Sequence, residues 1–118
     1  ASISNNSWTG TGYSASLETA IQNARAAGHI VVAAAGNSGS NVDLYPEYPA
    51  ALPEDNIISV AATDANDSLA SFSNYSASRV DLGAPGVGIR PGTPEALSSA
   101  PGVPCLVSKW AHNSTCGA

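Results

Sequence analysis

The sequence predicts an α/β protein with a mainly parallel sheet and a helix packed against it. Two observations predict this class. Residues 17–27 place apolar side chains at Leu17, Ala20, Ile21, Ala24 and Ala27, the 3-4-7 spacing of a helix with one buried face. The next segment, residues 30–35, is a continuous apolar run, as is typical of a strand covered on both faces.

The first three elements predict a βαβ unit. Residues 3–8 have strand character and end in the polar turn 9–12. A helix then follows Ser14, whose hydroxyl can accept a hydrogen bond from a free backbone N–H of the first turn. Gly28 is suited to end the helix, because glycine adopts a positive φ without strain. Strand, helix and strand with short connections predict parallel pairing with a right-handed crossover.

Two more strands are expected at residues 57–62 and 79–82, separated by a turn at 64–67. The proline-rich segment 42–56 predicts an ordered loop. The character of the chain changes at about residue 89, and residues 90–118 hold four of the eight prolines and both cysteines. We therefore divide the chain into a domain at 1–89 and an irregular tail at 90–118.

Composition excludes several classes of protein. The 118 residues suit one small domain, and a net charge of −5 with only four Lys and Arg argues against binding to nucleic acids or anionic membranes. No apolar run reaches the ~18 residues of a membrane span, and no signal peptide is visible at the first residues. Cys105 and Cys116 are close in sequence and form a candidate disulfide. The N-x-S/T sequons, among them Asn74, are expected by chance in a chain so rich in Asn and Ser.

Asn37 is the first candidate for chemistry. It follows the buried strand 30–35 inside the glycine-flanked turn 36–41. Ligands of open α/β sheets bind beyond the carboxyl ends of the strands, and an amide there can donate to charge developing on a substrate oxygen. The alternative is a turn residue that tolerates left-handed geometry.

The wider context resembles the subtilase family of serine proteases. The resemblance covers residues 2–89, in the order of the family, through the segments Ser4-Asn5-Asn6-Ser7-Trp8, Val31-Val32-Ala33-Ala34-Ala35-Gly36-Asn37, Tyr45-Pro46, Asn56-Ile57-Ile58-Ser59-Val60-Ala61-Ala62, Ala70-Ser71-Phe72-Ser73-Asn74-Tyr75 and Asp81-Leu82-Gly83-Ala84-Pro85-Gly86-Val87. It implies part of a doubly wound, mainly parallel subtilisin-like sheet. It also implies a secreted serine endopeptidase that acts on extended peptides or proteins.

The resemblance also implies roles for single residues. Asn37 corresponds to the side chain that stabilises the oxyanion. Ser7, Trp8 and Thr9 correspond to the strand that pairs with the substrate, a form of β-augmentation. Ala34, Ala35 and Gly36 correspond to one wall of the pocket for the residue before the scissile bond, although small residues there also suit close packing of strands.

The chain departs from the family pattern at two places. Thr9 replaces the usual glycine, so its β-branched side chain could narrow the pocket. The loop 45–49, Tyr-Pro-Glu-Tyr-Pro, differs in length from the common form. The resemblance implies a cis peptide bond at Tyr45–Pro46 and a weak Ca²⁺ or Na⁺ site formed by carbonyls of this loop; no other cofactor is expected.

The catalytic triad is the largest departure. The family uses Asp, His and Ser, and the Asp and His segments would precede Ala1. Gly92-Thr93-Pro94 looks like the start of the segment that carries the nucleophile, but it comes too early in the chain and has Pro94 in place of serine, so we interpret the likeness as coincidence. The two histidines, His29 and His112, have no triad around them, and a zinc site of His112 with the two cysteines lacks metal-motif spacing. We expect the isolated chain to be inactive and to need a longer precursor or a second chain; the alternative is a non-catalytic peptide-binding or structural protein derived from a subtilase.

Overall fold

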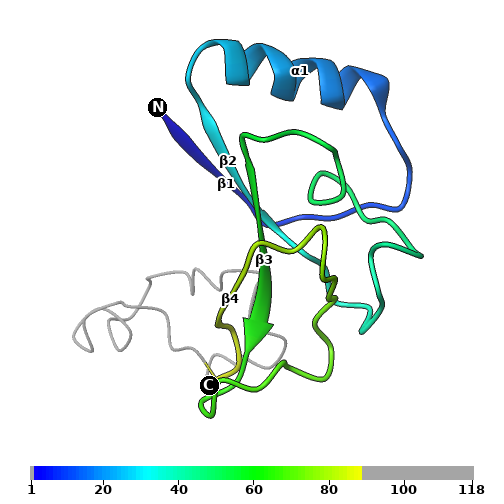
Figure 1. The fold of residues 1–118 in the computed structure, drawn as a ribbon, viewed down its shortest axis with the longest axis vertical. Helices are drawn as coiled ribbons and strands as arrows, with labels where there is room; N and C mark the ends of the chain where they lie inside the picture. The colour runs from blue at the N-terminus through cyan, green and yellow to red at the C-terminus, as the bar shows by residue number, and fades with distance from the viewer. Residues whose placement is uncertain (1, 89–118) are drawn as a thin grey trace, which may run out of the picture.

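The chain forms one parallel sheet with a single helix over residues 2–88, the part that the computed structural model describes (Figure 1). The strands lie side by side in chain order, β1-β2-β3-β4. The elements are β1 (Ile3–Asn6), α1 (Ala15–Ala26), β2 (Ile30–Ala34), β3 (Ile57–Thr63) and β4 (Leu82–Pro85). The predicted parallel α/β class is therefore confirmed.

Register sets which residues meet at the edge where the strands end. Asn6 of β1 lies opposite Ala33 of β2, and β2 pairs with β3 in parallel through Val31 and Ile57. Because all pairs are parallel, the segments that follow β1, β2 and β3 leave the sheet at the same edge. The turn with Asn37 is one of these segments.

The helix α1 begins and ends as the sequence predicts. The Ser14 hydroxyl accepts a hydrogen bond from the backbone N–H of Leu17 at 3.3 Å. Gly28 follows the last turn with φ 74°. Ile21 is the buried residue of the helix and faces the sheet.

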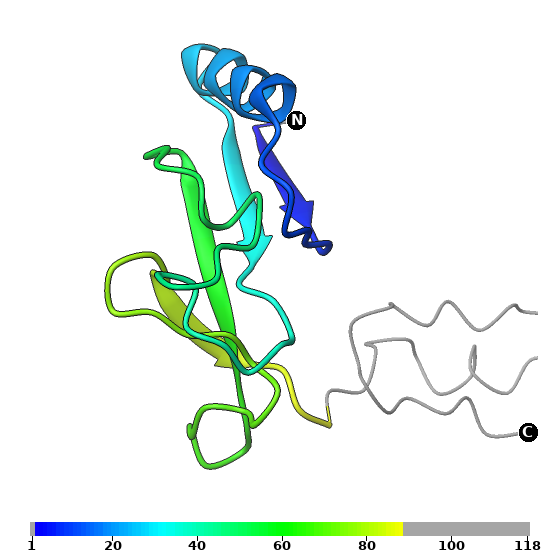
Figure 2. The same ribbon diagram turned by 90° about the vertical axis from the view of Figure 1, so that its right-hand side faces the viewer.

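The core lies between α1, the sheet and the proline-rich loop. Figures 1 and 2 show α1 close to β1 and β2 and far from β4. Small and branched side chains fill this space, with Leu17 and Tyr48 packed against them: Ile21, Val31, Ala33, Ala50, Leu52 and Ile57. The loop 42–56 is thus part of the core, which fits the prediction of an ordered loop.

The boundaries of all four strands differ from the predicted ones. β1 ends at Asn6 and β2 at Ala34, β3 extends to Thr63, and β4 spans Leu82–Pro85 instead of residues 79–82. Asp81 explains the last difference: its carboxylate accepts a hydrogen bond from the Ser59 N–H at 2.7 Å, while its own N–H donates to the Ser59 carbonyl at 2.9 Å. A side chain therefore takes one position of the β-ladder, and regular pairing starts one residue later.

The predicted cis peptide bond was assigned to the wrong proline. Within residues 2–88 the cis bond is Tyr48–Pro49, not Tyr45–Pro46. The two Tyr-Pro pairs look alike in sequence, but Pro49 is fully buried whereas Tyr45 is exposed. The tail 90–118, with Cys105 and Cys116, lies outside the described residues. In the described part of the chain, α1 is too short and polar to cross a membrane.

Candidate active site

The turn at residues 36–40, called the Asn37 turn below, leaves β2 at the carboxyl edge of the sheet. Gly36 starts it with φ 114°, a conformation that residues with a side chain rarely adopt. Asn37 itself is exposed, while Ala35 and Gly36 before it are buried. Asn37 is therefore accessible to solvent, while the two residues before it anchor the turn in the interior.

Asn74 holds both sides of this turn. Its side chain is fully buried, with the amide N–H₂ donating to the Ala35 carbonyl at 3.0 Å. Its side-chain oxygen accepts from the backbone N–H groups of Ser38 at 2.9 Å and Ser40 at 3.0 Å. One side chain thus binds the chain before Asn37 and after it, which limits the movement of the residue between.

Backbone hydrogen bonds align the segment 72–75 with the Asn37 turn. The N–H of Gly39 donates to the Phe72 carbonyl at 2.8 Å, and the N–H of Tyr75 donates to the Ser40 carbonyl at 3.1 Å. Ser73 connects this segment to β3, because its hydroxyl accepts from the Ala62 N–H at 2.8 Å. The turn is therefore fixed to β3 as well as to β2.

Glu47 is a buried carboxylate beneath the same turn. Its Oε1 accepts a hydrogen bond from the Ser38 hydroxyl at 2.6 Å. Burial raises the pKa of Glu47, but hydrogen bonds from Ser38, Thr9 and Asn74 outweigh this effect and leave the pKa below its ordinary value. The group is therefore an anion at neutral pH, stabilised by neutral donors.

Gly36 has no room for a side chain. A Cβ at this position would lie 2.2 Å from the Asn74 Nδ2 and 2.5 Å from the Glu47 Oε2. These separations are far below van der Waals contact. Glycine is thus required here both by φ and by the two polar side chains packed against it.

The segment after β1 lies against the proline-rich loop. Gly10 and Tyr48 exchange two backbone hydrogen bonds, of 3.0 and 2.8 Å. The rings of Tyr13 and Tyr48 meet edge to face with centroids 5.8 Å apart. Trp8 is 51% exposed, whereas Ser7 and Thr9 are half-buried.

The structure brings some of the predicted site residues together. Glu47 contacts Thr9 on one side and lies against Gly36 on the other. Ala34 ends β2 one position after the Ala33–Asn6 pair, and buried Ala35 connects it to the turn. Thr9 of the predicted substrate-pairing segment and Gly36 of the predicted pocket wall therefore both lie against one carboxylate.

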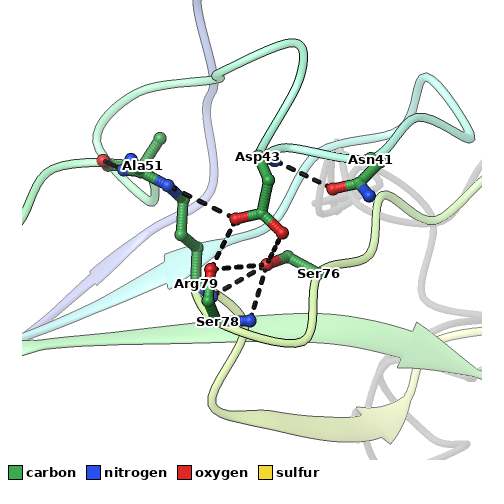
Figure 3. Close-up of polar contacts among 6 residues, drawn as sticks. All are labelled: Asn41, Asp43, Ala51, Ser76, Ser78 and Arg79. Carbon is green, nitrogen blue, oxygen red and sulfur yellow. Dashed lines mark hydrogen bonds and ion pairs between the residues drawn. The ribbon is translucent and has the colours of Figure 1, made fainter.

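A second polar cluster fixes the outer part of the loop (Figure 3). The Asp43 carboxylate accepts from the hydroxyls of Ser76 at 2.8 Å and Ser78 at 2.6 Å. The Arg79 Nε lies 3.5 Å from the Asp43 Oδ1, and the Arg79 guanidinium also donates a hydrogen bond to the Ala51 carbonyl. Hydrogen bonds from Ser78 and Ser76, with the charge of Arg79, hold the pKa of Asp43 below its ordinary value despite some burial. This cluster ties residues 43–51 to 76–79.

The weak cation site at the carbonyls of the loop 45–49 stays a prediction. The carbonyl oxygens of Glu47, Tyr48 and Pro49 each already accept a backbone N–H. The Glu47 carboxylate is held by Ser38, and residues 2–88 contain no group of three or more His, Cys, Asp or Glu that could hold a metal. We derive no step through a metal ion.

Sequence reasoning missed Glu47 and Asn74 as parts of the site. Asn74 occurred in a recognised motif and also as a sequon, but its amide is 0% exposed and hydrogen-bonded at both ends, which leaves no room for a glycan in the folded state. Glu47 carried one available signal, an acidic residue between two Tyr-Pro pairs in a loop otherwise suited to packing.

Comparisons with known proteins agree on one family. The model of the subtilase family matches residues 1–117. Alkaline elastase YaB from Bacillus sp. (strain YaB) is 42% identical over 93 residues, which is 78% of this chain and 23% of that protein. Thermitase from Thermoactinomyces vulgaris is 46% identical over 77 residues, covering 65% of this chain and 25% of that protein.

Solved structures show the same relation. A cold-adapted subtilisin-like serine proteinase superposes with a TM-score of 0.64 and 39% identity, over 74% of this chain and 30% of that one. A protease from Pseudoalteromonas arctica gives a TM-score of 0.65 and 36% identity, over 73% of this chain and 24% of that one. The chain spans about a quarter of the length of the curated relatives named above.

Proposed function

The chain belongs to the subtilase family of serine proteases, and from this premise we propose that it forms the oxyanion-stabilising and substrate-binding part of a serine endopeptidase. In this proposal Asn37 donates its side-chain N–H to the oxygen of the tetrahedral intermediate. Residues 7–9 and 34–36 bind the peptide on either side of the pocket for the residue before the scissile bond.

The observation that carries the proposal is the way Asn74 fixes the Asn37 turn. A donor to a developing oxyanion is effective only if it already points at the position where the charge forms, so that no reorganisation is needed during the reaction. Asn74 bonds to Ala35, Ser38 and Ser40, the residues on both sides of Asn37. These bonds supply the preorganisation that such a donor requires.

The peptide-binding role of residues 7–9 is supported by their place in the sheet. They continue from β1, beyond its last pair with β2, and Gly10 is anchored to Tyr48. Trp8 is exposed, so an extended peptide could pair with this segment as an added strand. Peptides or proteins are the proposed substrates, and the proposed site of action is extracellular.

The remaining catalytic groups belong, in this proposal, to sequence beyond these 118 residues. A serine would attack the carbonyl, a histidine would move the proton and an aspartate would orient the histidine. Asn37 would then stabilise the charge on the carbonyl oxygen. The serine, the histidine and the aspartate are supplied by the same longer chain or by a second chain, so the 118 residues alone do not hydrolyse peptides.

Labelling with a serine-directed fluorophosphonate tests this division of roles. We expect no stoichiometric labelling of the 118-residue chain, and one label per molecule in the complete protein that contains it. Stoichiometric labelling of the isolated chain would contradict the proposed inactivity. An unlabelled complete protein would instead favour a non-catalytic peptide-binding role.

A further inference from the structure

We propose that Glu47 makes this site select substrates with Lys or Arg immediately before the scissile bond. The inference rests on the proposed function, in which residues 7–9 and 34–36 bind the peptide on either side of that pocket, and we take each segment as one wall of it. It adds a chemical class of substrate that neither the family nor the catalytic groups determine.

The position of Glu47 is the first support. Its carboxylate receives a hydrogen bond from Thr9 on one proposed wall. On the other wall, Oε2 lies 2.5 Å from the point where a Cβ of Gly36 would stand. A group in contact with both segments lies between them, which is where the proposal places the base of the pocket. The absence of a Cβ at Gly36 leaves the carboxylate next to the backbone there.

The charge of Glu47 is the second support. Glu47 is buried, with 7% of its surface exposed, and the other charged side chain that is covered to this degree in residues 2–88, Glu54, pairs with Arg25. The Glu47 partners Ser38, Thr9 and Asn74 are neutral. The two arginines in residues 2–88 are engaged elsewhere, Arg25 with Glu54 and Asp55, and Arg79 with Asp43. Glu47 forms no ion pair within this part of the chain.

A buried anion without a cation discriminates between side chains of similar size. A carboxylate can accept about four hydrogen bonds, and three donors are accounted for, so one position remains for a ligand. An ammonium or guanidinium group would supply both the donor and the missing positive charge. An apolar side chain would displace water from the carboxylate without replacing the hydrogen bonds of that water. This loss would weaken the binding of apolar ligands.

A purely structural role for Glu47 is the competing interpretation, because its bond to Ser38 also supports the Asn37 turn. The two roles predict different outcomes. Loss of a structural anchor would weaken the handling of all substrates alike. Loss of a charge-selecting group would affect cationic ligands and leave their neutral isosteres unchanged.

The first experiment uses the 118-residue chain and requires no catalysis. ¹⁵N-labelled protein is titrated with benzamidine, which carries a positive charge, and with benzamide, its neutral isostere. We expect saturable shifts of the Gly36 and Ser38 amides with benzamidine, at least about tenfold weaker binding of benzamide, and loss of this difference in Glu47→Gln. Equal binding of the two probes by the unaltered chain would overturn the inference, even if Glu47→Gln does not fold.

The control variant is Asp55→Asn, which removes an exposed negative charge remote from the turn. Asp55→Asn should keep the preference for benzamidine over benzamide, because this preference comes from Glu47 and not from a general attraction of cations to an acidic chain. If Asp55→Asn and Glu47→Gln reduce benzamidine binding equally, the inference is wrong.

The second experiment uses the complete protease and peptides that differ only in Lys or norleucine before the scissile bond. We expect kcat/KM to be higher for the Lys peptide than for the norleucine peptide. Glu47→Gln should reduce the ratio of these two kcat/KM values at least about tenfold. Hydrolysis without a preference for Lys, or a preference that survives in Glu47→Gln, would overturn the inference about Glu47 but not the proposed function. Failure to hydrolyse any peptide, with no fluorophosphonate label, would count against the proposed function, and the probe titration would still decide the role of Glu47.

Discussion

Single residues explain why the Asn37 turn keeps its shape. Asn74 and Glu47 are both buried, and together they satisfy donors and acceptors on Ala35, Ser38 and Ser40. A buried polar group that loses its partner costs free energy, so each of these bonds favours one arrangement of the turn. The turn is thereby more rigid than its Ser- and Gly-rich sequence suggests.

Replacing Asn74 by Ala should destabilise the chain by about 2–3 kcal/mol, because the buried Ala35 carbonyl and the partly buried N–H groups of Ser38 and Ser40 lose their partner. Urea unfolding measures the effect. The matched control is Asn66→Ala, an exposed turn residue, which should change stability by less than about 0.5 kcal/mol. Equal effects of the two substitutions would show that Asn74 does not hold the turn.

Replacing Gly36 by Ala tests the close packing behind the turn. Gly28 is a suitable comparison, because it also has a positive φ, but no atom lies within 4 Å of the place that an added methyl group would take. We expect Gly28→Ala to cost about 1 kcal/mol for the backbone alone. Gly36→Ala should cost at least about 2 kcal/mol more, since the new methyl group meets Asn74 and Glu47. Thermal unfolding of both variants would reveal the difference, and equal losses would contradict the packing.

The lowered pKa of Glu47 predicts how stability depends on pH. A carboxyl whose folded pKa lies below its unfolded value stabilises the protein above the unfolded pKa, near 4.5, and loses this contribution as pH falls through the folded pKa. The stability difference between the unaltered chain and Glu47→Gln should therefore be constant near neutral pH and shrink in acid. If the stability of the unaltered chain relative to Glu47→Gln instead increases as pH falls below 4.5, burial and not hydrogen bonding would dominate the pKa of Glu47.

At the scale of elements, β2 and α1 were predictable because local sequence determines them. The apolar run of β2 and the helical spacing of α1 are periodic signals, and Ser14 and Gly28 mark the ends of the helix. The start of β4 was not predictable, because Asp81 contributes its side chain to the ladder next to Ser59. Val80 and its neighbours look like strand residues until that tertiary contact is known.

The parts of the site that sequence could not place depend on contacts between distant segments. Glu47 and Asn74 are 27 positions apart and meet at Gly36. The two Tyr-Pro pairs of the loop differ in burial, which no local pattern records. Family resemblance predicted Asn37 and its neighbouring strand as parts of the site, whereas the side chains that hold them were visible only in the folded structure.

The capping of α1 gives a prediction at the same scale. Ser14→Ala should reduce stability by about 1 kcal/mol, because the Leu17 N–H loses its acceptor. Ser16→Ala, inside the exposed face of the helix, should be neutral or slightly stabilising, since alanine is the better helix former. Chemical denaturation followed by circular dichroism compares the two. A loss for Ser16→Ala as large as that for Ser14→Ala would contradict the assignment of the cap.

At the scale of the whole molecule, the outer strands expose large apolar side chains. Ile3 on β1 is 59% exposed and Leu82 on β4 is 46% exposed. Strand edges and apolar surface of this kind promote association unless another segment covers them. Because the chain spans about a quarter of its curated relatives, we propose that the rest of a catalytic domain packs there. The isolated chain should then be weakly stable or oligomeric.

We propose that Asn37 is the oxyanion donor of a complete subtilase, and the kinetics of Asn37→Ala in the complete protease are the sharpest test of this role. We expect kcat to fall about 10²–10³-fold with little change in KM, a magnitude taken from the same donor elsewhere in the family. Asn66→Ala in the same protein should leave kcat unchanged. A kcat for Asn37→Ala within about twofold of the unaltered enzyme would contradict the account, because a donor used only in the transition state must lower kcat when it is lost.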